Sequence, residues 1–142
     1  MTPEELAHLH RLAFTSPPPW SARDFATFLN DPNCFLLSHI QGGEGQAFGL
    51  FRVVADEAEL LTLATAPDAR RRGLARDVLV KGLAKAQARG AVQCFLEVAA
   101  DNNAAILLYQ SVGFSEVGRR KSYYQIKGHT DVDALVFRAI IG

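Results

Sequence analysis

Two stretches in the first thirty residues carry the signals of helices. Thr2 can cap the first helix, because Pro3 then takes the first helical position and Glu5 the acidic position of a capping box. Three prolines at 17–19 exclude helix and favour an extended loop, after which Ser21 can cap a second short helix. One face of the first helix carries residues at spacings of three and four: Leu6, Leu9, His10 and Ala13.

The middle of the chain contains three β-prone runs and then a helical pattern. The runs at 34–40 and 47–54 are separated by Gly42-Gly43-Glu44-Gly45, which predicts a hairpin with a glycine-rich turn. The third predicted strand is 60–65. After Gly73, apolar residues recur at helical spacing until Gly90 ends the helix.

The last fifty residues predict further strands around one helix. Alternation along 92–98 predicts a strand in which Glu97 lies on the face opposite Leu96 and Cys94. The order of the elements predicts a mixed α+β fold with one parallel crossover near its middle. After residue 98 the chain predicts a helix at about 101–111 and then strands at 114–117, 122–126 and 134–141.

Length and composition fit one ordinary globular domain. The 142 residues predict a single domain over residues 1–142, and 49% hydrophobic with 21% charged residues excludes a disordered chain. Fifteen basic and fifteen acidic residues balance, so net charge gives no argument for a nucleic-acid or membrane partner. The charges are unevenly distributed, because residues 1–69 hold three basic and nine acidic side chains and residues 70–142 hold twelve and six.

Cysteine and histidine usage points to no metal site. Cys34 and Cys94 lack metal-ligand spacing, and we interpret both as small buried hydrophobes, with a disulfide between them left open. The first residues lack the pattern of a signal peptide, and no run approaches the roughly 20 apolar residues of a membrane helix. We therefore expect a cytoplasmic protein with no metal. The four histidines show no ligand or triad arrangement and are interpreted as surface or packing residues: His8, His10, His39 and His129.

The segment between the strand at 60–65 and the following helix has the features of an anion site. Unsatisfied backbone N–H groups and the positive end of the helix dipole meet at a helix N-terminus, and arginine adds charge for a pyrophosphate. No Gly-Lys-Ser/Thr and no G-x-G-x-x-G is present, which excludes the common triphosphate and dinucleotide loops. A solvated basic helix start and an RNA contact remain as alternatives. The segment is Arg70-Arg71-Arg72-Gly73-Leu74-Ala75-Arg76.

Arg70-x-x-Gly73-x-Ala75 resembles the Q/R-x-x-G-x-G/A pyrophosphate motif of the GNAT acetyltransferase superfamily. The likeness covers nearly the whole chain, and its further motifs look like those of the bacterial RimI-type ribosomal-protein alanine N-acetyltransferases. The further matching segments, in chain order, are Pro19-Trp20-Ser21 with Phe25, Leu61 to Pro67, Leu96-Glu97-Val98, Asn102 to Ala105, Leu108-Tyr109, Gly113-Phe114, Tyr123-Tyr124 and Asp133-Ala134-Leu135.

The resemblance implies a fold and a cosubstrate. The expected GNAT fold has a central mixed, mostly antiparallel sheet with a splayed parallel strand pair and about four flanking helices. The family's first edge strand is expected to be absent, because the helix signal already starts at Thr2. The implied cosubstrate is acetyl-CoA. Its expected binding residues are the strand backbone at Leu63, Ala64 and Thr65, the loop residues Arg70, Arg71, Arg72, Gly73, Leu74, Ala75 and Arg76, and Asn102.

The resemblance also implies catalytic roles. Glu97 matches the base that takes a proton from the acceptor amine, and Tyr109 matches the acid that protonates the departing thiolate. Each has an alternative: Glu97 could be a structural carboxylate paired with Arg119 or Arg120, and Tyr109 could be a core residue. Alternation turns Cys94 away from Glu97, which argues against an acyl-enzyme. Residues expected beside the acceptor channel are Trp20, Tyr123 and Tyr124.

The expected activity is acetyl transfer by direct attack of the N-terminal α-amine of a protein, a small-subunit ribosomal protein. An α-amine has a reference pKa of about 7.7–8.0, against about 10.4 for lysine, so it demands less of a base. The alternatives are acetylation of a small-molecule amine and a non-catalytic acyl-CoA-binding module. We expect no DNA or membrane partner, and a monomer or weak dimer.

Overall fold

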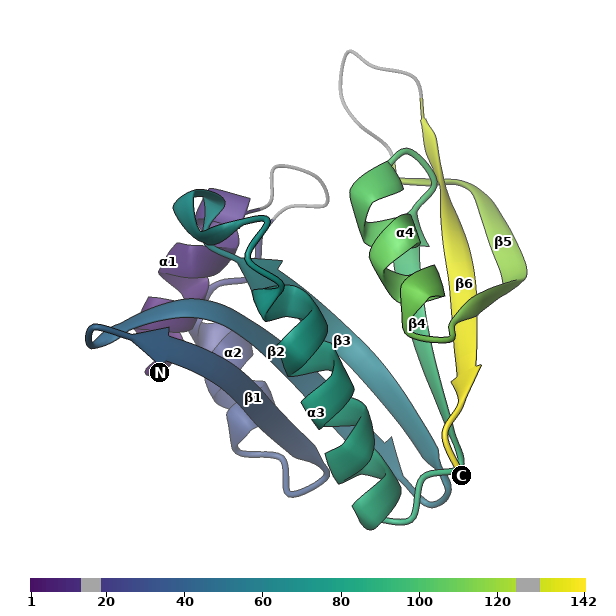
Figure 1. The fold of residues 1–142 in the computed structure, drawn as a ribbon, viewed down its shortest axis with the longest axis horizontal. Helices are drawn as coiled ribbons and strands as arrows, with labels where there is room; N and C mark the ends of the chain where they lie inside the picture. Colours follow the sequence, from purple (N-terminus) through teal and green to yellow (C-terminus); the bar gives the residue numbers. More distant parts are fainter. Residues whose placement is uncertain (14–18, 125–130) are drawn as a thin grey trace.

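The computed structural model describes residues 1–13, 19–124 and 131–142. Within these residues none of the helices is both long and apolar enough to span a membrane. A single 3-10 turn, Pro67–Ala69, joins the third strand to the third helix. In chain order the elements are α1 (Pro3–Ala13), α2 (Ala22–Leu29), β1 (Cys34–Gln41), β2 (Glu44–Val54), β3 (Glu57–Thr65), α3 (Leu74–Ala88), β4 (Gln93–Ala99), α4 (Asn103–Ser111), β5 (Ser115–Tyr124) and β6 (Val132–Ile140) (Figure 1).

The six strands of the described residues form one mixed sheet, which confirms the predicted fold class. Their order is β1-β2-β3-β4-β6-β5, and every neighbouring pair is antiparallel except β3 with β4. That parallel pair is joined only over Glu57–Glu59 and Gln93–Phe95. Beyond Glu59 the two strands diverge in a V (Figure 1). The β3 backbone groups that face β4 in this V therefore have no strand partner among the described residues.

A bulge in β3 accompanies this divergence. Leu50 pairs with Thr62 while the next residue of β2, Phe51, pairs with Leu60, so Leu61 is the extra residue. A bulge bends its strand and sharpens the twist. In this sheet the bend occurs where β3 leaves β4.

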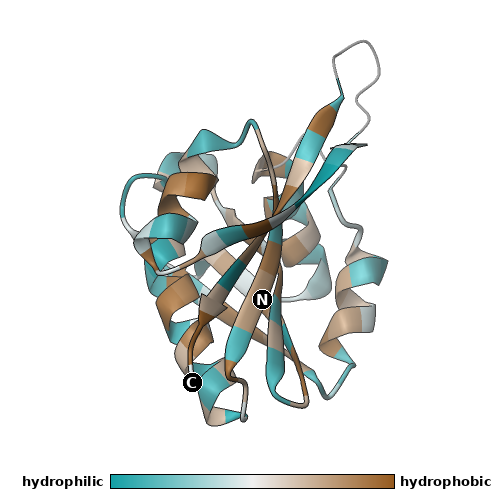
Figure 2. Ribbon diagram, turned by 90° about the vertical axis from the view of Figure 1, so that its right-hand side faces the viewer, coloured by the Kyte–Doolittle hydropathy of each residue, from teal (hydrophilic) through white to brown (hydrophobic). Residues whose placement is uncertain are grey.

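Helices cover both faces of the sheet (Figure 2). The first face packs on α1 and α2 around Phe25, Phe48 and Leu50, all of them fully buried. The second face packs on α3 and α4 around Phe51 and Phe137. The sheet is therefore the middle layer of three, and the V between β3 and β4 is open toward both layers.

The N-terminal helices begin where the capping signals predict. The Thr2 side chain accepts the Glu5 N–H at 3.1 Å, and the Glu5 carboxylate accepts the Thr2 N–H at 3.3 Å. Ser21 and Asp24 form the same reciprocal pair, at 3.1 and 3.0 Å. The chain thus enters α1 directly at Pro3, and β1 forms one edge of the sheet. No strand precedes α1 in the part of the chain that the structure describes.

Two strand boundaries differ from the prediction. The turn of the first hairpin is only Gly42-Gly43, both with positive φ, so β2 already begins at Glu44. The prediction of two separate strands at 114–117 and 122–126 is wrong as far as residue 124. The structure instead has one strand there, β5, with two register shifts against β6. Asp133 of β6 holds it through Arg119 (3.0 Å) and the Ser122 backbone N–H (2.8 Å). Residues 125–126, Pro17, Pro18 and His129 lie outside the described residues.

Candidate active site

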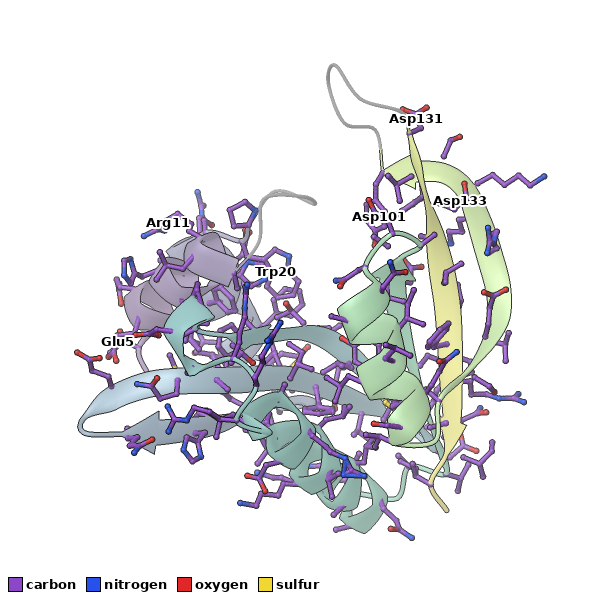
Figure 3. The ribbon with its side chains drawn as sticks, turned by 45° about the horizontal axis from the view of Figure 1, so that its top comes forward. Glu5, Arg11, Trp20, Asp101, Asp131 and Asp133 are labelled. Atoms are coloured by element: carbon purple, nitrogen blue, oxygen red, sulfur yellow. The ribbon has the colours of Figure 1, made fainter. Side chains whose placement is uncertain are left out.

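A cleft of about 850 Å³ occupies the V between β3 and β4. Its walls come from both strands, from α4 and β5, and from the segment before α2. In Figure 3, Trp20 lies on the α1 side of the molecule and Asp101 lies on the α4 side. The predicted site residues that line this cleft are Trp20, Leu63, Glu97, Asn102, Tyr109, Tyr123 and Tyr124.

Glu97 enters the cleft from the face of the sheet that carries α1 and α2. The alternation of β4 turns Cys94, Leu96 and Val98 into the opposite layer, as predicted. The Glu97 side chain is 33% exposed, and its Oε1 lies 3.3 Å from Nη2 of Arg120 on β5. The expected contact with Arg120 is therefore present, and the carboxylate still faces the cleft.

The alternative pair with Arg119 is wrong. Arg119 contacts Asp133 at 3.0 Å and Glu116 at 3.7 Å, on the other side of β5. Arg120 instead lies over the ring of Tyr123, 5.2 Å from its centroid. The guanidinium beside Glu97 is thus held between a carboxylate and an aromatic face.

Tyr109 reaches the same cleft from the opposite layer. It lies on α4, is 8% exposed and makes edge contacts with Phe114 and Phe137, at centroid distances of 5.9 and 6.5 Å. Burial raises the pKa of the Tyr109 phenol well above its ordinary value, and Tyr124 adds to this rise. A phenol that stays protonated can donate a proton, and an exposed carboxylate can accept one. The cleft therefore brings a donor and an acceptor together from the two faces of the sheet.

The predicted anion segment forms the start of α3. Gly73 caps the helix in the left-handed region at φ 73°, and Arg71 also has positive φ at 66°. Asp77 is the first residue whose N–H bonds to a helical carbonyl, that of Gly73, at 3.0 Å. The three preceding N–H groups, of Leu74, Ala75 and Arg76, are left for a ligand or water.

The arginines of this segment lie outside the cleft lining. Arg70, Arg71, Arg72 and Arg76 are exposed, and Arg72 donates to the Gln41 side chain at the end of β1. The structure therefore separates the predicted site into two parts, a cleft between the strands and a cluster of arginines and free N–H groups at the start of α3.

The remaining residues predicted to bind the cofactor differ in the groups that they could present to it. Leu63 lines the cleft, whereas the side chain of Ala64 is buried in the layer of α1 and α2. Thr65 ends β3 opposite Ala47. Asn102 caps α4 by accepting the Ala105 N–H at 3.3 Å, which leaves its amide NH₂ available as a donor.

Aromatic side chains form the outer wall of the cleft. Tyr123 is half exposed and contacts Tyr124 at a centroid distance of 5.3 Å. Burial and the nearby Glu97 charge raise the pKa of Tyr124. Trp20 stacks on Phe28 with ring centroids 4.9 Å apart. The rings that line the cleft thus come from distant parts of the sequence.

The sequence interpretation of His10 as a packing residue is correct but incomplete. His10 is 3% exposed, and it also lines the cleft. Its Nε2 lies 2.9 Å from Oγ1 of Thr62, and its Nδ1 accepts the backbone N–H of Trp20 at 2.9 Å. The only sequence signal was its position on the apolar face of α1, between Leu9 and Ala13.

The structure also bears on acyl-enzyme formation and on metal binding. Cys94 is fully buried away from Glu97, and burial raises the pKa of its thiol to about 12, so it is not placed to form an acyl-enzyme. Among residues 1–13, 19–124 and 131–142, no three His, Cys, Asp or Glu side chains gather as metal ligands would.

Comparison with known proteins connects this geometry to a family. The model of the acetyltransferase (GNAT) family matches residues 4–114. The [ribosomal protein bS18]-alanine N-acetyltransferase of Escherichia coli K12 is 41% identical over 107 residues, 75% of this chain and 71% of that protein. The N-alpha-acetyltransferase RimI of Mycobacterium tuberculosis is 34% identical over 129 residues, 88% of this chain and 80% of that one.

A solved structure agrees with these relatives. The crystal structure of the ribosomal-protein-S18-alanine N-acetyltransferase from Escherichia coli superimposes with a TM-score of 0.89 and 34% identity, over 99% of this chain and 88% of that chain. The chain is thus an acetyltransferase enzyme and belongs to the GNAT family.

Proposed function

We propose that residues 1–142 form a single domain that transfers an acetyl group from acetyl-CoA to the N-terminal α-amine of a protein, that of a small-subunit ribosomal protein. The observation that carries the proposal is the meeting of Glu97 and Tyr109 in one cleft, in a chain whose relatives are N-terminal acetyltransferases. With such a substrate we expect the enzyme in the cytoplasm, as a monomer or weak dimer.

The features of the V suit a pantetheine chain and a pyrophosphate. The unpaired backbone groups of β3 at Leu63–Thr65 offer hydrogen bonds to the amides of an extended ligand. The free N–H groups at the start of α3, with Arg71 and Arg76, offer an anion site. Asn102 adds a side-chain donor. Acetyl-CoA supplies a thioester carbon that an amine can attack.

The proposed reaction is a direct transfer. The neutral amine nitrogen bonds to the thioester carbonyl carbon, and the bond from that carbon to sulfur breaks. Glu97 accepts the proton that the ammonium form of the acceptor loses before the attack. Tyr109 donates its phenolic proton to the leaving thiolate and takes back the proton that the new amide nitrogen loses. No covalent enzyme intermediate is needed, in agreement with the buried position of Cys94.

Trp20, Tyr123 and Tyr124 are proposed to contact the acceptor. They stand on the same side of the sheet as Glu97, away from α3. In this arrangement acetyl-CoA approaches from the layer of α3 and α4, and the acceptor approaches from the layer of α1 and α2. The two substrates thus meet inside the V.

Acceptor preference tests the proposed substrate. Release of CoA is measured with three acceptors: a short peptide beginning with alanine, the same peptide with a blocked N-terminus and an internal lysine, and spermidine. We expect activity with the free α-amine only. Activity on spermidine without activity on the alanine peptide would move the enzyme to small-molecule amines. Binding of acetyl-CoA without turnover of any amine would indicate a binding module.

Glu97→Gln tests the role of the carboxylate. The variant is expected to lower kcat/KM for the alanine peptide about tenfold at pH 7, where roughly a tenth of the α-amine is already neutral. The deficit should shrink toward pH 9, because most of the amine is then deprotonated without help. The measurement is the pH profile of kcat/KM for both proteins.

Glu116→Gln is the matched control for this variant. Glu116 is another strand glutamate in contact with an arginine, but it lies outside the cleft, so its variant should keep the wild-type profile. A Glu97→Gln deficit that stays constant from pH 7 to pH 9 would contradict the role as base and leave Glu97 as a partner for Arg120.

A further inference from the structure

His10 ties two parts of the acceptor side together through a defined tautomer. Its Nδ1 accepts the Trp20 backbone N–H, so this nitrogen carries no proton. In the neutral ring the proton is then on Nε2, which donates to Oγ1 of Thr62 at 2.9 Å. Thr62 thus receives a hydrogen bond from a residue 52 positions earlier in the chain.

This direction of donation leaves the Thr62 hydroxyl proton for another partner. A threonine oxygen has two acceptor positions and one donor, and His10 occupies an acceptor position. Thr62 lines the cleft, and it follows the β3 bulge at Leu61. It shares the α1 side of the sheet with Glu97 across the V.

Packing alone accounts poorly for a histidine at this position. The imidazole is surrounded by the rings of Trp20, Phe25 and Phe48, at centroid distances of 5.6, 5.5 and 6.3 Å. Moving a polar ring into an aromatic cluster costs free energy that its hydrogen bonds must offset. An apolar residue would fill the same space without this cost. What only the histidine supplies is the link from the cleft hydroxyl to the Trp20 backbone.

We propose that His10 is a positioning residue for the acceptor: it fixes Trp20 in the cleft wall and orients the Thr62 hydroxyl to donate to a backbone carbonyl oxygen of the acceptor peptide. The proposal rests on the proposed function, because it needs a peptide acceptor. A peptide carbonyl is the fitting partner. In an N-terminal acceptor the first carbonyl carbon is two bonds from the α-amine nitrogen, whereas small polyamines have no carbonyl group. Thr62 is the contacting group, and His10 acts through it.

The test is a set of variants with both Michaelis constants measured on an alanine-initiated peptide. Thr62→Val keeps the shape of the side chain but removes the hydroxyl, and it should raise the peptide KM about tenfold, the loss expected for one hydrogen bond. The KM for acetyl-CoA should stay within about twofold. Thr62→Ser restores the hydroxyl and should restore the peptide KM.

A double-mutant cycle tests the link to His10. His10→Phe should raise the peptide KM by a similar factor, and the His10→Phe, Thr62→Val double variant should add little to either single change. Thr27→Val is the control, because Thr27 lies on the exposed face of α2, and its variant should leave both constants unchanged. Fluorescence of Trp20, the one tryptophan of the chain, gives peptide affinity independently of turnover.

The outcomes separate this inference from the proposed function. If the wild type acetylates the peptide and Thr62→Val leaves its KM unchanged, only the positioning role is overturned. An equal rise of the KM for peptide and for acetyl-CoA would overturn it too, because that pattern indicates a general disturbance of the V. If the wild type acetylates no peptide, the proposed function fails first, and the positioning role fails with it.

Discussion

Tyr109→Phe is expected to lower kcat about a hundredfold, while the KM for acetyl-CoA changes by less than about twofold. Proton transfer by a positioned side chain contributes typically 10²–10⁴-fold to a rate. The burial that raises the Tyr109 pKa keeps the phenol protonated at every pH at which the enzyme would work. The variant removes one oxygen and retains the ring contacts with Phe114 and Phe137, so the fold should persist.

Steady-state kinetics and thermal unfolding of the same preparation decide between the roles of Tyr109. A loss confined to kcat assigns the hydroxyl to the transition state. Normal kcat with a lowered melting temperature would assign Tyr109 to the core, the alternative that the sequence already offered. A rise in the acetyl-CoA KM at constant kcat would instead make Tyr109 a binding residue for the cosubstrate.

Local signals predicted the parts of the fold that neighbouring residues determine. The capping boxes at Thr2 and Ser21 require residues only three positions apart, and both helices begin there. The alternation along β4 placed Glu97 opposite Cys94 because strand periodicity needs no distant partner. The resemblance then supplied the sheet with its parallel pair.

Contacts between distant elements were not predictable in this way. The choice between Arg119 and Arg120 as the partner of Glu97 depends on the register of β5 against β6, and the shifts in that register are tertiary features. The predicted break in β5 has a related cause: its polar residues lack alternation because both sides of this edge strand are exposed. Asp133 on the neighbouring strand β6 holds β5 in place through Arg119 and the Ser122 N–H.

The bond between His10 and Thr62 is the clearest example of this limit. Neither residue type in its own segment predicts a contact 52 positions away. A histidine on an apolar helix face is equally compatible with a residue that only packs in the core. Thr62 lines the cleft directly after the bulge at Leu61, in the part of β3 that no longer pairs with β4. The motifs thus predicted which residues line the cleft, whereas the contact between His10 and Thr62 became visible only in the structure.

Lowering the pH from 7 to 4.5 is expected to reduce the free energy of unfolding by about 2 to 3 kcal/mol through His10 alone. Burial lowers the pKa of His10 from 6.5 to about 4. Between these values the unfolded chain binds a proton that the folded protein excludes, so stability falls as the pH falls. The contribution is complete above about pH 6.5 and is lost progressively toward pH 4.

Urea unfolding at pH 7 and pH 4.5 measures this loss, with His10→Phe as the reference protein. The variant lacks the titrating group, so its stability should fall less than that of the wild type, by the same 2 to 3 kcal/mol. Other groups titrate in both proteins and cancel in the difference. Asp133 is one of them, because the Ser122 N–H and Arg119 lower the pKa of its carboxyl. Equal losses in the two proteins would mean that the folded protein accepts a proton at His10 as readily as the unfolded chain. In that case the neutral tautomer would not be what holds Thr62, and the acceptor wall would have to keep its shape with a charged imidazole behind it.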